Sequence, residues 1–406
     1  MTPVVSLYEE SRRLRGSSLD GFYIPQFEVR IEGVGLPRNV LRDVIQLTYK
    51  DNIKTIDSFE LTVNNWNPST NNFKYVGSET AESLQGDTPE SQRFRLFEPC
   101  RKEVKVYMGY VGNLRVMLTG NFTTMGPNFS NSGAPTLTVR GLNILHQLRR
   151  KQNIRTWRNK KISQAVKSLE STLPIPIDID RNAQSEETPQ EFIAQRNQYD
   201  IDFIFARARE RGYVVFIQEA DPNVQGSQPR LYFGPSHGYG VPQPRGDIFQ
   251  LEWGKSLIDF KPTLTTANQI RSVTVRGWHR RSGRTISATV NLDDRRLNRN
   301  RDLYDLLQKC DPREEVVVDE PIFSQGQARQ RAIAILMDRQ KEMVKASGTT
   351  IGLPDLRAGN RVLICNLGSR FSGVYFVEET THTINDSGYI TKFKARREDD
   401  GRSESQ

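Results

Sequence analysis

Hydrophobic and polar residues alternate along most of the chain, as they do in half-buried β-strands. The alternation begins at residues 27–37, FEVRIEGVGLP, and continues in VIQLTYK and SFELTVNN. A loop at residues 67–92, rich in Asn, Ser, Thr, Gly and acidic residues, separates these from EVKVYMGYVG, NLRVMLTGNFTTM and TLTVRGL. The pattern predicts an N-terminal arm at residues 1–22 and a first antiparallel β-barrel at residues 23–142.

Helical periodicity appears after residue 142 and is mixed with short strands such as IPIDID, YVVFI and RLYFG. In the segment TPQEF, Thr188 and Glu191 have the spacing of a capping box, which predicts a helix start. A further helix is predicted to begin at Asp200 and to end at Gly212. Residues 143–249 are therefore predicted to form an α+β insert.

Alternation returns from residue 250 and predicts a second barrel at residues 250–397. Its strands include QLEWGKSLIDFKPTL, a hairpin QIRSVTVRGWHRRSGRTISATV that turns at Arg281-Ser282-Gly283, and the segments RVLICNL, SGVYFVEET and YITKFKAR. A charged loop and an amphipathic helix at residues 325–344 are predicted to interrupt this barrel at residues 291–346. Residues 398–406 form a polar tail.

The second barrel repeats an element of the first. The sequence TTMGPNFSNSGAPTLTVR begins at Thr123, and TTHTINDSGYITKFKAR begins at Thr380. Each copy has paired threonines, an Asn/Asp-Ser-Gly turn and an alternating strand that ends in Arg, so each predicts a hairpin whose glycine takes a positive φ. The predicted structural turns are at Gly133, Gly359, Gly373 and Gly388.

The composition fits a globular protein of two to four domains with long polar loops. The chain has 406 residues, of which 36% are hydrophobic and 26% charged, and its mean hydropathy is −0.60. No apolar run approaches the length of a membrane span. The first residues, MTPVVSLYEESRRLRG, lack the apolar region of a secretory signal, so synthesis in the cytoplasm is expected.

The net charge of +9 leaves nucleic-acid binding open as an alternative, and residues 276–284, RGWHRRSGR, are its strongest candidate. The 57 basic and 48 acidic residues are spread along the chain, which favours a solvated surface. Trp253, Trp278 and Phe393 alternate with basic residues and could stack on bases, but their period of two favours burial in a core or interface. No specific nucleic-acid ligand is predicted.

The residues that carry chemistry are scattered. Neither the cysteines nor the histidines have the spacing of a metal site, and we expect reduced thiols and structural or surface imidazoles: Cys100, Cys310, Cys365, His146, His237, His279 and His382. Asp178 and Asp180 would share one strand face, and they favour structural use because no third ligand accompanies them. Asp200 and Asp202 suit a helix start, and Gly-Tyr-Gly at 238–240 suits a turn. We predict no catalytic, cofactor-binding or metal-binding residues, and a protein that is not an enzyme.

Four passages carry a resemblance to a known family: YDIDFIFARARERGYVVF, IRSVTVRGWHRRSGRTI, GTTIGLPDLRAGNRVLI and GSRFSGVYFVEETTHTINDSGYITKFKARR. In these passages and in its layout the chain resembles the phage late control D proteins, the tail-hub family that includes the hub part of VgrG spike proteins and the hubs of extracellular contractile injection systems. The resemblance implies a mainly β chain with two similar tube-type barrels. Three such chains would form a pseudo-sixfold ring.

The resemblance also implies a function and partners. A hub of this family is a homotrimer that adapts a threefold spike to a sixfold inner tube, nucleates tube assembly and is surrounded by baseplate wedge proteins. It implies cytoplasmic assembly followed by incorporation into a phage-tail-like particle. VgrG-type chains continue into a spike, whereas this sequence ends at GRSESQ, so a separate spike protein is expected. The alternative is a peptidoglycan-active or carbohydrate-binding baseplate protein that uses Asp178 and Asp180.

Overall fold

The computed structural model describes residues 4–6, 24–99, 102–220, 226–236, 248–279, 282–293, 307–310 and 313–398. Most of the predicted arm and tail lie outside these ranges, as do Cys100, His237, residues 238–240, Arg281 and much of the charged loop. Within the described ranges, no helix has the length and apolar character needed to cross a membrane.

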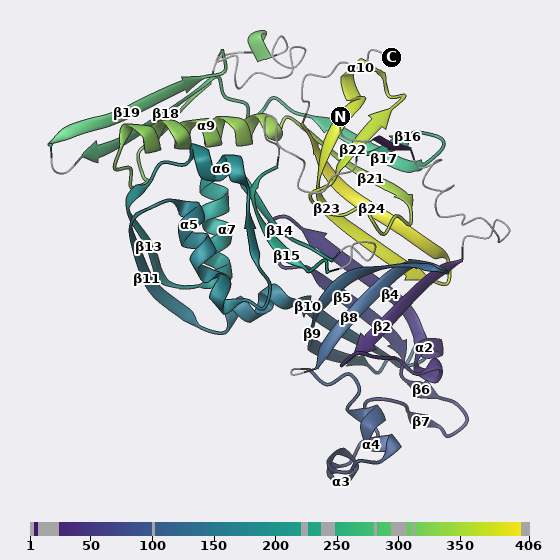
Figure 1. Ribbon diagram of the computed structural model, residues 1–406. Helices are drawn as coiled ribbons and strands as arrows, with labels where there is room; N and C mark the ends of the chain where they lie inside the picture. The colour runs from purple at the N-terminus through teal and green to yellow at the C-terminus, as the bar shows by residue number, and fades with distance from the viewer. Residues whose placement is uncertain are drawn as a thin grey trace.

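A 14-stranded sheet dominates the molecule (Figure 1). Its first region comprises β2 (Pro25–Ile31), β3 (Val34–Gly35), β4 (Val44–Asn52), β5 (Ser58–Asn64), β8 (Glu103–Tyr110), β9 (Asn113–Asn128) and β10 (Thr136–Asn143). Its second region comprises β1 (Val4–Ser6), β16 (Ile248–Glu252), β17 (Leu257–Leu264), β21 (Val344–Ile351), β22 (Arg361–Cys365), β23 (Gly373–Asn385) and β24 (Gly388–Arg397). The chain is thus mainly β, as predicted.

The two regions are continuous because β23 pairs with β4 as well as with β22 and β24. This differs from the expectation of two separate antiparallel barrels. Among the described strands no ring of ladders closes, and β16 and β17 share only an isolated bridge between Trp253 and Leu257. The β1–β16 and β16–β22 pairs are also parallel. Alternation reports which face of a strand is buried, but it does not report which strand lies beside it.

Both predicted hairpins are present, as β9–β10 and β23–β24. In β23–β24 the chain reverses in two residues, and Gly388 has a φ of +120°. Gly133 has no positive φ, contrary to the prediction, because residues 129–135 reverse the chain in a longer loop. Gly373, at the start of β23, has a φ of +135°.

The insert contains two small sheets and several helices. β11 (Gln152–Lys160) pairs with β13 (Gln190–Tyr199), and a second sheet has the order β12 (Ile177–Ile179), β15 (Arg230–Pro235), β14 (Tyr213–Gln218). The helices are η1 (Ile144–Arg149), α5 (Ile162–Lys167), η2 (Ser168–Thr172), α6 (Arg181–Glu186) and α7 (Asp200–Arg211).

Helix α7 ends as predicted, at Gly212 in the left-handed conformation with φ +67°. The helix start predicted at Thr188 and Glu191 is wrong, because β13 occupies this segment. Phe192 and Ile193 pair there with Arg158 and Trp157 of β11. The tertiary pairing has outweighed the local capping signal.

A third unit projects beyond the main sheet (Figure 1). It consists of β18 (Ser272–His279), β19 (Arg284–Asn291) and β20 (Glu314–Val317), and α9 (Gln325–Lys341) packs on this sheet. The hairpin assigned from the sequence to the second barrel therefore lies in a separate sheet. Its inward residues are buried against α9, which an alternating pattern cannot distinguish from burial in a barrel.

The remaining elements are short and lie at the edges of the sheet regions. They are α2 (Arg38–Asp43), β6 (Trp66–Asn67), β7 (Asn72–Phe73), α3 (Ala81–Gln85), α4 (Pro89–Phe94) and α10 (Gly368–Phe371).

Candidate functional site

The two sheet regions and the insert meet at a buried junction formed around the loop of residues 352–360, between β21 and β22. A small apolar cluster there draws on all three parts: Ile53, Val214, Phe216, Tyr232, Ala358 and Phe376. The loop carries the sequence GLPDLRAGN, which belongs to the third of the family-like passages. We call these residues and the polar network beside them the junction.

An ion pair between Arg357 of this loop and Asp51 of β4 lies at the centre of the junction. Their side chains are only 6% and 4% exposed, and Arg357 Nε donates to Asp51 Oδ2 at 2.8 Å. The guanidinium also donates to the Met117 carbonyl at 2.6 Å and to the Tyr49 hydroxyl. A residue of the second sheet region thus fills the donor and acceptor needs of two strands in the first, β4 and β9.

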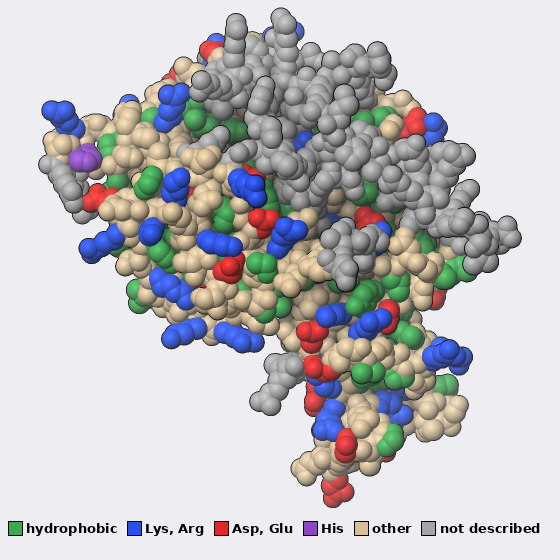
Figure 2. Space-filling model, viewed as in Figure 1, with side chains coloured by type: hydrophobic (Ala, Val, Ile, Leu, Met, Phe, Trp, Pro, Cys, Tyr) green, Lys and Arg blue, Asp and Glu red, His purple; other side chains and the backbone are tan. Residues whose placement is uncertain are grey.

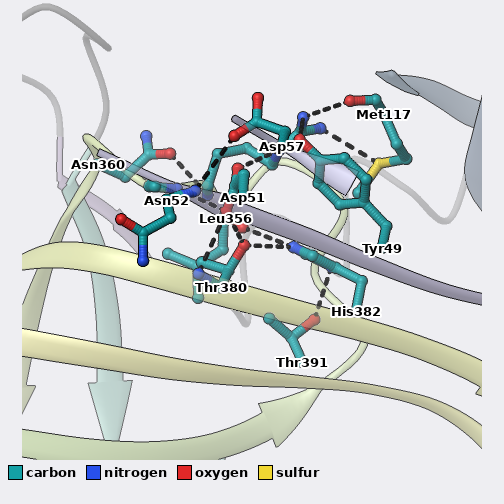
Figure 3. Close-up of polar contacts among 12 residues, drawn as sticks. Tyr49, Asp51, Asn52, Asp57, Met117, Leu356, Asn360, Thr380, His382 and Thr391 are labelled. Carbon is teal, nitrogen blue, oxygen red and sulfur yellow. Dashed lines mark hydrogen bonds and ion pairs between the residues drawn. The ribbon is translucent and has the colours of Figure 1, made fainter. Parts of the chain in front are cut away.

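The other oxygen of Asp51 links β4 to β23 and to the loop. Oδ1 accepts hydrogen bonds from the backbone N–H groups of Ala358 and Thr380, each at 3.2 Å, and from the Thr380 hydroxyl (Figure 3). Burial by itself would lower the pKa of Arg357, but Tyr49 and Asp51 outweigh it and raise that pKa. Both members of the pair are therefore charged at neutral pH.

His382 extends the network to β24. Its Nε2 lies 3.0 Å from the Leu356 carbonyl, and its Nδ1 lies 2.9 Å from the Tyr389 hydroxyl and 3.1 Å from the Thr391 hydroxyl. Because a carbonyl only accepts, Nε2 carries the proton and Nδ1 accepts. Burial lowers the pKa of His382 to about 3, so the ring is neutral. It is a structural residue, as the sequence favoured.

Asp57 introduces a strained charge beside this network. Its carboxylate accepts from the Asn52 backbone N–H at 3.2 Å and from Asn143 Nδ2 at 2.8 Å. Burial and the nearby Asp51 raise the pKa of Asp57 to about 7. Two carboxylates that share a buried region resist ionising together.

The insert is held against the junction by close packing at Gly359. This glycine has a φ of +95°, and a Cβ there would lie 2.8 Å from the ring of Phe216 in β14. Its N–H donates to the Val377 carbonyl of β23 at 2.9 Å. Glycine is required because both the backbone conformation and the approach of the ring exclude a side chain.

A second charged cluster fastens the end of β24 to the insert and to α9. Glu398 accepts from Arg396 at 2.8 Å and from the Ser236 hydroxyl at 2.9 Å, and Lys341 lies 4.0 Å away. Burial would raise the pKa of Glu398, but Arg396 and Lys341 lower it to about 2. Arg396 also donates to Glu378 at 2.6 Å.

These contacts fix the relative positions of the parts. Each carboxylate at the centre of the junction is matched by donors, and buried networks of this kind hold one arrangement when their members are satisfied. The network lies away from solvent and gathers residues of both sheet regions. It is suited to carrying mechanical load between them.

The residues singled out for chemistry are not brought together. Asp178 faces Arg230 at 3.4 Å, and Asp180 is buried at the start of α6. No group of three metal-ligating side chains occurs among the described residues. Asp200 is buried and pairs with Arg155, while Asp202 lies 3.6 Å from Arg149.

The aromatic residues divide. Phe393 is buried in the second sheet region, as favoured, whereas Trp253 and Trp278 are 61% and 56% exposed and do not belong to the core. Cys310 and Cys365 are free thiols. His146 and His279 lie far from the junction.

The sequence gave no prominence to Asp51 or Arg357, although one signal pointed to Asp51. Leu47, Tyr49 and Asp51 occupy alternate positions of β4, and the first two are fully buried. An acid in the buried register of a strand requires a buried partner. Nothing in the local sequence of β4 indicates that the partner is Arg357.

Comparisons with known proteins place this fold. A family model described as the Alg8 N-terminal domain matches residues 23–386. That description names a domain and states no activity. A comparison with curated proteins finds no matching sequence.

Three solved structures share the fold over most of their lengths. The 43 kDa tail protein of prophage MuSo2 from Shewanella oneidensis has a TM-score of 0.62 at 12% identity, with 92% of this chain and 98% of that chain covered. The tail protein from Neisseria meningitidis MC58 has a TM-score of 0.62 at 14% identity, with 93% and 97% covered. An E. coli type VI secretion system component, described as similar to the T4 tail proteins gp27 and gp5, has a TM-score of 0.53 at 13% identity, with 92% and 78% covered.

Proposed function

The chain belongs to the Alg8 N-terminal domain family, and from this membership and its fold we propose that it is a structural protein of a contractile phage-tail-like particle. Within the particle it serves as the baseplate hub, which joins a threefold spike to a sixfold inner tube and nucleates tube assembly. Its role is mechanical rather than enzymatic.

The observation that carries the proposal is the extent of the shared fold. The two bacterial tail proteins are matched over 98% and 97% of their own lengths, so the likeness includes both sheet regions and the insert. A mechanical role is further supported by the junction, in which Arg357 and Asp51 connect the two regions through buried contacts. A hub must keep these regions in fixed register under load.

The symmetry argument rests on the two similar hairpins, β9–β10 and β23–β24. A trimer of this chain would present six such hairpins, which suits a sixfold tube on one side and a threefold spike on the other. The partners are accordingly two further copies of the chain, a spike protein, tube proteins and wedge proteins. Assembly takes place in the cytoplasm, before the particle acts.

The test is the mass of the full chain in solution, measured by size exclusion with light scattering, alone and with the co-expressed spike protein. A mass three times 46.5 kDa in at least one condition is the expected result. Class averages from electron microscopy should then show a ring with six similar lobes. A monomer in both conditions, or a dimer, would overturn the hub assignment.

A control for the measurement is the Trp253→Ser variant. Trp253 is exposed next to the isolated bridge at the edge of the second sheet region, so a trimer that closes there should weaken. Trp278→Ser, an equally exposed tryptophan on the separate β18–β19 sheet, is the matched comparison. Equal effects of both changes would indicate non-specific association and would count against the ring.

A further inference from the structure

A groove separates the insert from the third unit, and nothing in the proposed hub role uses it. It has a volume of about 430 Å³ and is lined by β13, by the last turns of α7, by residues 320–323 and by the first half of α9. Basic side chains predominate over acidic ones on the face of the insert and α9 shown in Figure 2. The groove therefore offers a concave, positively charged surface.

The charge of the groove is not neutralised by its own residues. Four arginines and two glutamates line it. Arg331 pairs with Glu320 at 2.5 Å, and Arg207 pairs with Glu210 at 2.8 Å. Arg211 donates to the neutral amide of Gln330 at 2.6 Å.

Two arginines thus remain without an acidic partner in the described part of the chain, Arg196 and Arg211. A guanidinium recognises a carboxylate through paired N–H donors. Phe192 and Phe323, which are 40% and 43% exposed, add apolar surface on the lips of the groove. The lining therefore matches a ligand that has carboxylates next to apolar side chains.

The course of β13 indicates the shape of this ligand. Consecutive residues Phe192, Ile193 and Ala194 all line the groove, although successive side chains of a strand point to opposite faces. The groove consequently runs along an edge of β13 rather than over one face. The ladder with β11 occupies only one edge of β13, and an unpaired edge accepts an extended chain.

We propose that this groove binds an extended, acidic segment of a partner protein, which adds as a strand to the free edge of β13 and places carboxylates against Arg196 and Arg211. A protein segment is favoured over nucleic acid because Glu210 and Glu320 also line the groove and would repel a continuous polyanion. The proposal does not depend on the hub assignment.

The test uses a short fluorescein-labelled peptide of alternating Glu and Val, with a Lys and Val peptide of the same length as its counterpart. Binding to the full chain is followed by fluorescence anisotropy. The acidic peptide should bind, and the double change Arg196→Glu with Arg211→Glu should weaken it about tenfold or more, because charge reversal replaces attraction with repulsion.

The matched control reverses two arginines outside the groove, Arg209→Glu on α7 and Arg329→Glu on α9. Both are exposed and do not line the groove, and the net charge falls equally. This control should change the affinity by less than about twofold, in keeping with a screened surface charge. Equal losses in the two double variants would reduce the binding to general charge attraction and overturn the proposal.

Two further probes separate the alternatives. Peptides with N-methyl groups on all Glu or on all Val amides test strand addition, since only one of the two patterns faces β13 and should block binding. If both N-methylated peptides bind like the parent, no strand is added and that part of the proposal fails. An oligo-dT that binds more tightly than the acidic peptide at physiological salt, and is lost in the same variant, would assign the groove to nucleic acid instead.

The outcome is distinguishable from that of the hub test. The variant with Arg196→Glu and Arg211→Glu should retain the trimeric mass, because it changes side chains of the groove rather than of the sheet regions. Loss of peptide binding with the mass unchanged supports the groove, while a monomeric wild-type chain that still binds the peptide would overturn the hub alone.

Discussion

Replacing Arg357 with Met tests whether the junction holds the two sheet regions together. Met has a similar length and fits an apolar site, so the change removes the charge with little loss of volume. It leaves Asp51 buried with an exposed fraction of 3% and without its cation. It also removes the donor to the Met117 carbonyl and to the Tyr49 hydroxyl.

The expected cost is about 3–5 kcal/mol, the range for breaking a buried ion pair from one side. Most of this cost is the penalty of the uncompensated carboxylate rather than the attraction of the pair. Combining Arg357→Met with Asp51→Asn should therefore restore part of the stability, because the remaining group is neutral and Asn keeps an acceptor for Ala358 and Thr380. A coupling of roughly 1–3 kcal/mol between the two changes is expected.

Amide hydrogen exchange followed by mass spectrometry is the suitable assay, since a chain of several parts need not unfold in one step. In Arg357→Met, exchange in β4 and β23 should accelerate by more than about a hundredfold, while the β18–β19 hairpin stays protected. Arg329→Met, an exposed change on α9, is the control. Unchanged exchange in β4 and β23, or costs that simply add in the double variant, would refute the reasoning.

Three further predictions concern single sites. The depressed pKa of Glu398, about 2, contributes stability that is present above pH 4.5 and lost as the pH falls towards 2; Glu398→Gln should lower the thermal midpoint at pH 7 and flatten this acid loss. The raised pKa of Asp57, about 7, has the opposite sign: stability should fall as the pH rises from about 4 to 7, and Asp57→Asn should abolish that slope in chemical denaturation at several pH values. Gly359→Ala should destabilise by about 1–3 kcal/mol, and by more than Gly226→Ala, since both have a positive φ but only Gly359 is crowded by Phe216; equal melting shifts would show that the ring contact is unimportant.

Some of the candidate site could be predicted from the sequence, and some could not. The β23–β24 hairpin and the burial of His382 in a structural role follow from turn residues and from the lack of metal-ligand spacing. The position of Asp51 in the buried register of β4 was readable from alternation. Its partner was not, because Arg357 lies 306 residues away and the local sequence holds no record of contacts at that distance.

The errors have a common cause. The segment after Thr188 has the spacing of a helix cap but forms β13, because pairing with β11 outweighs a local preference of about 1 kcal/mol. The β18–β19 hairpin was correctly identified and wrongly placed, because α9 buries its inner face as well as a barrel would. Both depend on which neighbour supplies the buried surface.

The sequence by itself determined the local elements: most strands, both hairpins, and the helices α7 and α9. These depend on side-chain periodicity, caps and glycine turns, which act between residues close in the chain. Only the tertiary structure decided that β4 and β23 join the two regions into one sheet, that Arg357 neutralises Asp51, and that β13 borders a groove. Contacts of this kind form between distant residues, where many pairings satisfy the same local pattern and only the complete packing selects one.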